Sequence, residues 1–331
     1  MRVLVTGASG LLGGGVATAL AARGDDVTVL QRRPSNLGLR EVLGDITDPA
    51  AVAHAVEGCD AVIHLAAKVN VTGEWAEYHR INVLGTKALL AACRDAGVSH
   101  MVHVSSPSVA HAGSSLVGAG SGAADPAHAR GHYARSKAMA ELLALEADAR
   151  HELAVVAIRP HLVWGPGDTQ LVERIGRRAR SGRLPIIGSG APLVDTIYID
   201  NAVDAMVAAL DRCEEVHGQA FVVTNGEPRP IGEILGDWAR CTGAPRPARH
   251  VPAGLARFAG SAVDAVTSIR QRLGHDMSTD PPLTRFLAEQ LSTAHWFDQR
   301  ETRQALVWSP RISLDEGFAR LADWYSRHPL R

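Results

Sequence analysis

Tyr133 and Lys137 are the residues whose types and spacing point most directly to chemistry. They lie four positions apart in the segment GHYARSK, residues 131–137. On a helix this spacing places both side chains on one face, with Cβ atoms about 5–6 Å apart. An ammonium group at that distance favours ionised tyrosine and is expected to lower its pKa from about 10 toward neutrality. Such a tyrosine can protonate a carbonyl oxygen during reduction and accept the proton during oxidation.

The elements that must position this pair form an alternating pattern in the first half of the chain. Strands are predicted at residues 2–6, 26–30, 39–43, 61–67, 100–106 and 153–159. Helices are predicted at 11–23, 50–57, 77–96 and 132–150. Apolar strands separated by helices are typical of a parallel sheet covered on both faces. The sequence therefore predicts an α/β fold with a doubly wound, Rossmann-type parallel sheet that binds a dinucleotide.

A glycine-rich turn follows the first predicted strand directly. The segment GASGLLG, residues 7–13, lets backbone N–H groups approach a pyrophosphate at a helix N-terminus. A tight turn without a ligand is the alternative interpretation. Gly14 and Gly15 extend the run, and no function is predicted for them.

The end of the second strand bears on the choice of cofactor. Gln31 stands where NAD-binding folds usually carry an acidic residue, and Arg32 and Arg33 follow it. Two guanidinium groups suit a 2′-phosphate, although an arginine-rich solvated turn is the alternative. Asp45, after the third strand, is expected to meet the adenine. We predict that NADP(H) is preferred, with NAD(H) as the alternative cofactor.

Composition narrows the classes of function. The chain has 46% hydrophobic and 21% charged residues, and its formal charge of -1 gives no field that would attract nucleic acid. The basic run 173–183 is interpreted as a solvated helix face. The cysteines have no CxxC spacing, no targeting segment precedes the first strand, and no apolar run approaches about 18 residues. A cytoplasmic protein is expected, with peripheral membrane contact at most.

Together these segments resemble the extended short-chain dehydrogenase/reductases. The resemblance rests on residues 7–13, 44–48 (GDITD), 64–67 (HLAA), 82–86 (NVLGT), 104–109 (VSSPSV), Tyr133 with Lys137, 159–168 (RPHLVWGPGD) and 198–205 (YIDNAVDA). It implies a catalytic trio of Ser106, Tyr133 and Lys137, in which Ser106 donates to the developing alkoxide. It also implies that Lys137 binds the nicotinamide ribose and that Asn82 orders a helix.

The resemblance implies two further sets of contacts. The expected cofactor-binding residues are Gly7, Ser9, Gly10, Leu11, Leu12, Gly13, Gln31, Arg32, Arg33, Asp45, Ile46, Leu65, Ala66, Ala67, Lys137, Pro160 and Val163. The expected substrate-binding residues are Ser108, His161, Trp164, Asp195 and Tyr198. No metal is expected, because His100 and His103 fall on opposite faces of a strand.

The resemblance also implies a division of the chain. Residues 1–164 and 199–225 would form the dinucleotide-binding domain, and 165–198 and 226–331 a smaller substrate domain. Residues 112–131, rich in Gly, Ala and Ser, are interpreted as a mobile loop beside the active site. The apolar segment 251–274, with 283–291, is expected to wall a long apolar channel; a buried structural helix is the alternative.

Three functions within this resemblance are considered. Sugar dehydratases carry an Asp-Glu pair where Pro107 and Ser108 stand, which disfavours sugar dehydration. The segment VSSPSV fits a 3β-hydroxysteroid or sterol-carboxylate dehydrogenase. The C-terminal half resembles most the bacterial 2-alkyl-3-oxoalkanoate reductases of olefin and β-lactone biosynthesis, through residues 159–172, 194–202, 224–228 and 281–296.

The expected function is therefore NADPH-dependent reduction of the 3-keto group of long-chain 2-alkyl-3-oxoalkanoic acids. The resemblance implies a hydrophobic small-molecule substrate, a homodimer, and other enzymes of the same lipid pathway as partners. A nucleotide-sensing regulator is the non-enzymatic alternative. That class is disfavoured because Ser106, Tyr133 and Lys137 are all present.

Overall fold

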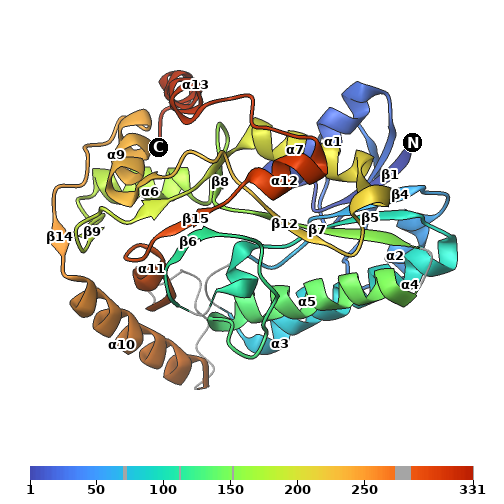
Figure 1. Ribbon diagram of the computed structural model, residues 1–331, viewed down its shortest axis with the longest axis horizontal. Helices are drawn as coiled ribbons and strands as arrows, with labels where there is room; N and C mark the ends of the chain where they lie inside the picture. The colour runs from blue at the N-terminus through green and yellow to red at the C-terminus, as the bar shows by residue number, and fades with distance from the viewer. Residues whose placement is uncertain (70–72, 112, 151–152, 273–284, 331) are drawn as a thin grey trace.

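The computed structural model describes residues 1–69, 73–111, 113–150, 153–272 and 285–330 (Figure 1). Its centre is a seven-stranded parallel sheet in the order β12-β7-β5-β4-β1-β2-β3. The strands are β1 (Arg2–Thr6), β2 (Asp26–Gln31), β3 (Arg40–Leu43), β4 (Ala61–His64), β5 (His100–Val104), β7 (Ala154–Pro160) and β12 (Ala220–Val223). This order confirms the predicted doubly wound fold.

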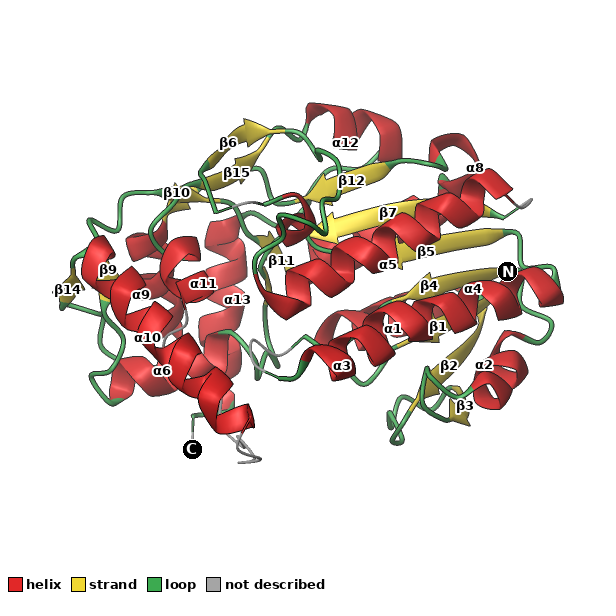
Figure 2. Cartoon of the chain, turned by 90° about the horizontal axis from the view of Figure 1, so that it is seen from below, coloured by secondary structure: helices red, strands yellow, loops and turns green. Residues whose placement is uncertain are grey.

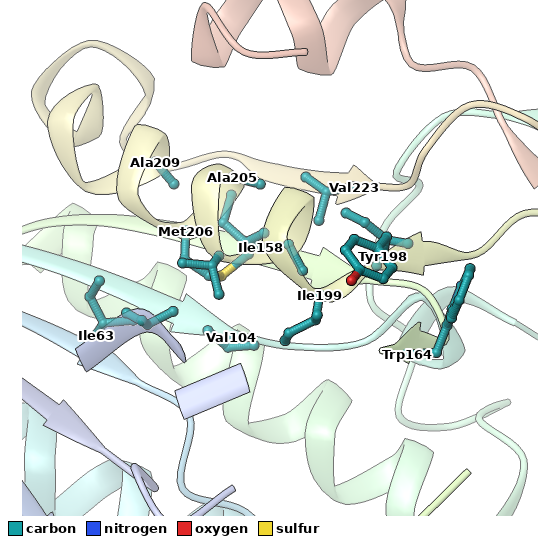
Figure 3. Packing of buried hydrophobic residues seen from close by; sticks show 14 of the residues in the cluster. Ile63, Val104, Ile158, Trp164, Tyr198, Ile199, Ala205, Met206, Ala209 and Val223 are labelled. Atoms are coloured by element: carbon teal, nitrogen blue, oxygen red, sulfur yellow. The ribbon is translucent and has the colours of Figure 1, made fainter. Parts of the chain in front are cut away.

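Helices cover both faces of this sheet because its strands are apolar on both sides. In β1, Val3 and Val5 join the core under α1 (Leu11–Arg23) and α7 (Ile199–Asp211). Leu4 joins the opposite core, to which α2 (Pro49–Val56), α4 (Gly85–Ala96) and α5 (Gly131–Arg150) contribute. Figure 3 shows α7 lying on the strands, with Met206 and Ile199 close to Ile158 and Val104.

Gly14 and Gly15 have a packing role that the sequence did not reveal. A Cβ atom on Gly15 would lie 2.7 Å from Val203 Cγ2 on α7, and one on Gly14 would lie 3.0 Å from the backbone oxygen of Ala8. The first distance requires a neighbouring atom to shift, and the second is tighter than most Cβ contacts. The two glycines therefore let α1 approach α7 and the preceding turn.

The helix predicted at 77–96 consists of three parts. They are α3 (Trp75–Tyr78), a π-helical segment (His79–Leu84) and α4. Asn82, within the π-helical turn, accepts a hydrogen bond from Lys68 N at 2.7 Å and donates to Lys68 O at 3.1 Å. It also donates to Ser136 Oγ on α5 at 2.9 Å. Asn82 thus ties the π-helical segment to the helix that carries Tyr133 and Lys137.

The remaining elements lie mainly beyond the carboxyl ends of the strands (Figure 2). A second sheet has the order β13-β10-β15-β6, and two smaller sheets pair β11 with β8 and β14 with β9. The strands are β6 (Leu116–Ala119), β8 (Val163–Trp164), β9 (Ile186–Ile187), β10 (Leu193–Val194), β11 (Ile197–Tyr198), β13 (Arg229–Pro230), β14 (His250–Val251) and β15 (His295–Phe297). The helices are α6 (Val172–Arg180), α8 (Cys213–Val216), α9 (Ile231–Cys241), α10 (Ala253–Arg272), α11 (Arg285–Gln290), α12 (Arg300–Leu306) and α13 (Leu314–Arg327).

The segment predicted as a mobile loop, 112–131, contains strand β6. This strand pairs in parallel with β15, near the other end of the chain. The guanidinium of Arg159 on β7 also holds the segment, since it donates to Ser121 O and, at 3.1 Å, to Gly122 O. The prediction of a loop throughout is therefore wrong, because strand pairing and a buried cation supply partners for its backbone.

Arg159 and Glu141 form a buried ion pair between β7 and α5. The Arg159 side chain is 1% exposed and that of Glu141 is 1% exposed. Arg159 donates from Nε to Glu141 Oε2 at 2.8 Å and from its terminal nitrogen to Glu141 Oε1. Because Arg159 also binds the carbonyls of Ser121 and Gly122, the pair connects α5 with the β6 segment.

We predict that Glu141→Gln lowers the free energy of unfolding by about 3–5 kcal/mol, because it leaves a buried guanidinium without its counter-charge. The matched control is Glu173→Gln, which removes the exposed i,i+4 pair with Arg177 on α6. That change is expected to lower the unfolding free energy by less than about 1 kcal/mol. Urea denaturation measures both. Equal, small effects would show that the buried pair does not hold the two elements together.

Candidate active site

One cavity of about 1220 Å³ receives most of the predicted site residues. Its wall includes every predicted cofactor-binding residue except Arg33, which is exposed and lies outside the wall. Ser106, Tyr133 and Lys137 lie on the same wall. Parallel strands bring their carboxyl ends to one edge of a sheet, which is why segments so far apart in the sequence meet there.

The glycine turn has a geometry that only glycine permits. Gly7 has a φ of 78°, and a Cβ atom there would lie 2.8 Å from Ala66 N. A Cβ atom on Gly13 would lie 2.3 Å from Gly7 O. Gly10 caps α1 without a side-chain hydrogen bond, so the first N–H groups of the 13-residue helix have no side-chain acceptor there. These residues fit the pyrophosphate of a dinucleotide.

A polar network holds the turn against β4, and the sequence did not predict it. Thr6 Oγ1 accepts hydrogen bonds from Leu65 N at 3.1 Å and Ala66 N at 3.0 Å, and it lies 2.8 Å from His64 Nδ1. His64 Nε2 lies 3.0 Å from Thr86 Oγ1. Burial lowers the pKa of His64 to about 3, so the ring is neutral and can bridge the two hydroxyl groups. The network links β1, β4 and α4.

The adenosine end of the cavity carries charges of both signs. Gln31 and Arg32 lie on the wall, together with Ser35. Behind them, Glu41 Oε1 accepts from Gln31 Nε2 at 3.1 Å and from Ser35 N at 2.8 Å. Hydrogen bonds from Ser35 hold the pKa of Glu41 below its ordinary value, so this carboxylate is ionised at neutral pH. Arg32 favours a 2′-phosphate in this region, and Glu41 opposes one.

The three predicted catalytic residues meet at the end of β5. Ser106 caps the short 3-10 helix Pro107–Ala110, and its Oγ lies 2.9 Å from Ser108 Oγ. The hydroxyl of Tyr133 forms a hydrogen bond with Ser106. Lys137 Nζ donates to Val104 O at 2.6 Å. Two hydroxyl groups and one buried ammonium group therefore converge where a carbonyl oxygen can be bound.

The pKa of Tyr133 differs from the prediction. Burial raises the pKa of this phenol above its ordinary value of 10, and the hydrogen bond from Ser106 opposes that rise only in part. Burial also lowers the pKa of Lys137 to about 8, while Glu141 favours its charged form. The predicted fall toward neutrality is therefore wrong for the protein alone. Tyr133 remains a protonated phenol at neutral pH, which suits a proton donor.

Two of the five predicted substrate residues, Ser108 and His161, lie on the cavity wall. The prediction is wrong for Trp164, Asp195 and Tyr198, which are buried outside it. Trp164 stacks on Phe318 with ring centroids 4.6 Å apart and meets Tyr198 edge-on at 5.3 Å. Figure 3 shows Trp164 and Tyr198 packed within the core.

Strand geometry explains this correction. Val163 and Val194 lie on the cavity wall, and the residue that follows each of them, Trp164 or Asp195, points the other way. Asp195 Oδ2 accepts from Phe297 N at 3.2 Å, so it braces β15 from behind. Strands of two residues are too short for a sequence pattern to show which side faces the cavity.

The predicted channel wall is also corrected. The described wall contains no residue of α10, and Leu255 and Phe258 on that helix are 59% and 74% exposed. Part of the expected wall, residues 273–274 and 283–284, lies outside the described residues. Of the predicted wall, Gln290 and Leu291 do line the cavity. The rest of the apolar wall comes from Ile175, Val194, Ile231, Leu235, Trp238 and Phe297. Within the described ranges, no helix combines the length and apolar character that crossing a bilayer requires.

Comparison with known proteins agrees with this geometry. The chain is 39% identical over 331 residues to a 2-alkyl-3-oxoalkanoate reductase of Stenotrophomonas maltophilia (strain K279a), covering 97% of this chain and 98% of the relative. It is 37% identical over 334 residues to a protein of the same name from Shewanella oneidensis, covering 97% and 85%. The structure of MoeE5 in complex with UDP-glucose and NAD superposes with a TM-score of 0.75 at 27% identity, covering 99% of each chain.

A family model for the NAD dependent epimerase/dehydratase family matches residues 3–224, which is more than half of the chain. Relatives at 37% and 39% identity extend the likeness over almost all of it. The seven-stranded sheet and the glycine turn are the parts of the structure that this family uses to bind NAD. The chain therefore belongs to the NAD dependent epimerase/dehydratase family and is an oxidoreductase of the extended short-chain dehydrogenase/reductase type.

Proposed function

We propose that this protein is an NADPH-dependent reductase of the 3-keto group of long-chain 2-alkyl-3-oxoalkanoic acids. The observation that carries the proposal is a single cavity lined by the glycine turn, the Ser106, Tyr133 and Lys137 trio, and an apolar wall. The names of the relatives from Stenotrophomonas and Shewanella support the same substrate class.

In this reaction the hydroxyl groups of Ser106 and Tyr133 hold the ketone oxygen. A bound nicotinamide cofactor would supply the hydride that adds to the carbonyl carbon. Tyr133 donates its proton to the oxygen, which becomes the 3-hydroxyl group. Ser106 stabilises the developing negative charge. Lys137 is fixed by Val104 O, and its ammonium group stabilises the tyrosinate that remains.

The apolar wall supports a substrate with alkyl chains. Its side chains come from α6, α9 and β15 and from Leu291, so apolar surface from separate elements faces one space. Each buried CH₂ group contributes roughly 0.8 kcal/mol, or about fourfold in binding. Affinity is therefore expected to rise with chain length until the apolar part of the cavity is filled.

Chain length tests the substrate class. We predict that kcat/KM for 2-alkyl-3-oxoalkanoic acids rises by up to about fourfold per methylene over a series of short to long chains, and then levels off. Oxidation of NADPH, followed by absorbance, measures the series. The comparison substrate is a 3-ketosteroid. A flat response to chain length together with faster turnover of the steroid would move the assignment to a 3β-hydroxysteroid dehydrogenase.

The charges near Gln31 yield a prediction about the cofactor. Arg32→Ala is expected to weaken NADPH binding by about 10- to 150-fold, because a charge-assisted hydrogen bond contributes roughly 1.5–3 kcal/mol. NADH binding should change little. Arg33→Ala is the matched control, since Arg33 lies outside the cavity wall. Fluorescence titration measures both affinities. Equal affinity of the unchanged protein for NADH and NADPH would contradict the proposed preference.

A further inference from the structure

Three histidines from distant parts of the sequence meet on the wall of the cavity. His111 follows the 3-10 helix after Ser106, His161 follows β7, and His295 begins β15. The rings of His111 and His295 have centroids 4.7 Å apart, and those of His161 and His295 are 6.2 Å apart. The Ser-Tyr-Lys chemistry described above uses none of these rings.

The hydrogen bonds favour one placement of the ring protons. Thr293 Oγ1 donates to Glu289 O at 2.7 Å, so it can only accept from His295 Nε2 at 3.2 Å. His295 Nε2 therefore carries a hydrogen, which also faces His111 Nε2 at 3.3 Å. The lone pair of His111 lies at Nε2, and its own hydrogen lies on Nδ1. His161 hydrogen-bonds the backbone of Asp195, which leaves its Nδ1 as a lone pair.

Each ring thus keeps one buried polar nitrogen without a partner among the described residues. The Nδ1 atoms of His111, His161 and His295 are all in this state. One of them is a donor and two are acceptors. A carboxyl group with its proton can pair with two of the three, since its O–H donates to one acceptor nitrogen and its carbonyl oxygen accepts from the donor. Among the described residues, no group of three or more His, Cys, Asp or Glu side chains is arranged to hold a metal ion.

Charged groups of both signs lie near the cluster. Glu289 and Arg130 act on His111 with opposite effects, and both lie within 3.3 Å of the place where a Cβ atom on Gly113 would be. Burial raises the pKa of Asp195, behind His161, to about 6. Burial lowers the pKa of His161 to about 4 and of His295 to about 3, so the rings are neutral before a ligand arrives.

We propose that His111, His161 and His295 form the subsite for the carboxyl group of the substrate. The inference rests on the proposed function, because a 2-alkyl-3-oxoalkanoic acid carries its carboxyl group two bonds from the keto carbon. His111 N donates to Ser108 O at 3.4 Å, and Ser108 Oγ contacts Ser106 Oγ. The subsite is therefore built on the same segment as the catalytic hydroxyl. The ring of Phe297, 5.3 Å from that of His161, offers an apolar surface beside it.

The test uses the reverse reaction, since 3-hydroxy acids do not decarboxylate as 3-oxo acids do. A 2-alkyl-3-hydroxyalkanoic acid and its methyl ester are oxidised with NADP⁺ by the unchanged protein and by His111→Leu and His161→Leu. The unchanged protein is expected to prefer the acid. Each variant should lose about 10- to 150-fold in kcat/KM on the acid and clearly less on the ester. His54→Leu, an exposed position on α2, should keep the preference.

Cofactor titration and thermal melting establish that each variant is folded, and His161→Gln replaces His161→Leu if the latter does not fold. An acid-to-ester ratio that stays unchanged in folded variants would overturn the subsite. Equal oxidation of acid and ester by the unchanged protein would overturn the subsite and leave the reductase intact. Oxidation of a 3β-hydroxysteroid but of neither fatty substrate would instead overturn the proposed function, and the subsite with it.

Discussion

The hydrogen bond from Lys137 Nζ to the carbonyl of Val104, 2.6 Å long, joins the catalytic helix to the centre of the sheet. Burial lowers the pKa of this ammonium group to about 8, and the charge of Glu141 favours its charged form. Glu141 in turn is paired with Arg159 in a buried salt bridge. Alternating charges thus run from the end of β5 along α5 to β7.

The last member of this series, Arg159, also contacts the segment that supports the apolar cavity wall. Arg159 binds the carbonyls of Ser121 and Gly122, which follow β6, and β6 pairs with β15. β15 carries His295 and Phe297 on the cavity wall. The position of the catalytic helix and the position of the substrate wall are therefore coupled through one buried guanidinium. We expect disturbance of this pair to affect both the stability of the fold and the shape of the cavity.

Local patterns were sufficient to predict the sheet and the helix that carries Tyr133 and Lys137. Continuous apolar runs separated by helices predicted the parallel sheet, and the four-residue spacing of Tyr133 and Lys137 predicted one shared helix face. The glycine turn was also predictable, because its position after the first strand fixes its role. All of these features depend on residues close together in the sequence, where periodicity and turn chemistry act directly.

Contacts between distant segments could not be predicted in this way. His111 and His295 meet across 184 positions, and Glu41 reaches Gln31 only because β2 and β3 are neighbours. Gly15 is explained by Val203 on α7. The π-helical turn around Asn82 is short, and its pattern of apolar residues is too close to that of an ordinary helix for the sequence to reveal it. The pKa of Tyr133 was misjudged because spacing gives the distance to a charge and gives no measure of burial.

The central claim is that α5 presents Tyr133 as the proton donor to a ketone. The most direct test compares the turnover of Tyr133→Phe with that of Tyr198→Phe. Both variants remove one hydroxyl group from an aromatic ring, but Tyr133 lies on the cavity wall and Tyr198 is buried outside it. Tyr133→Phe should reduce turnover by at least about 10²-fold with NADPH binding retained, and Tyr198→Phe should keep turnover close to that of the unchanged protein. Turnover of Tyr133→Phe close to that of the unchanged protein would contradict the claim.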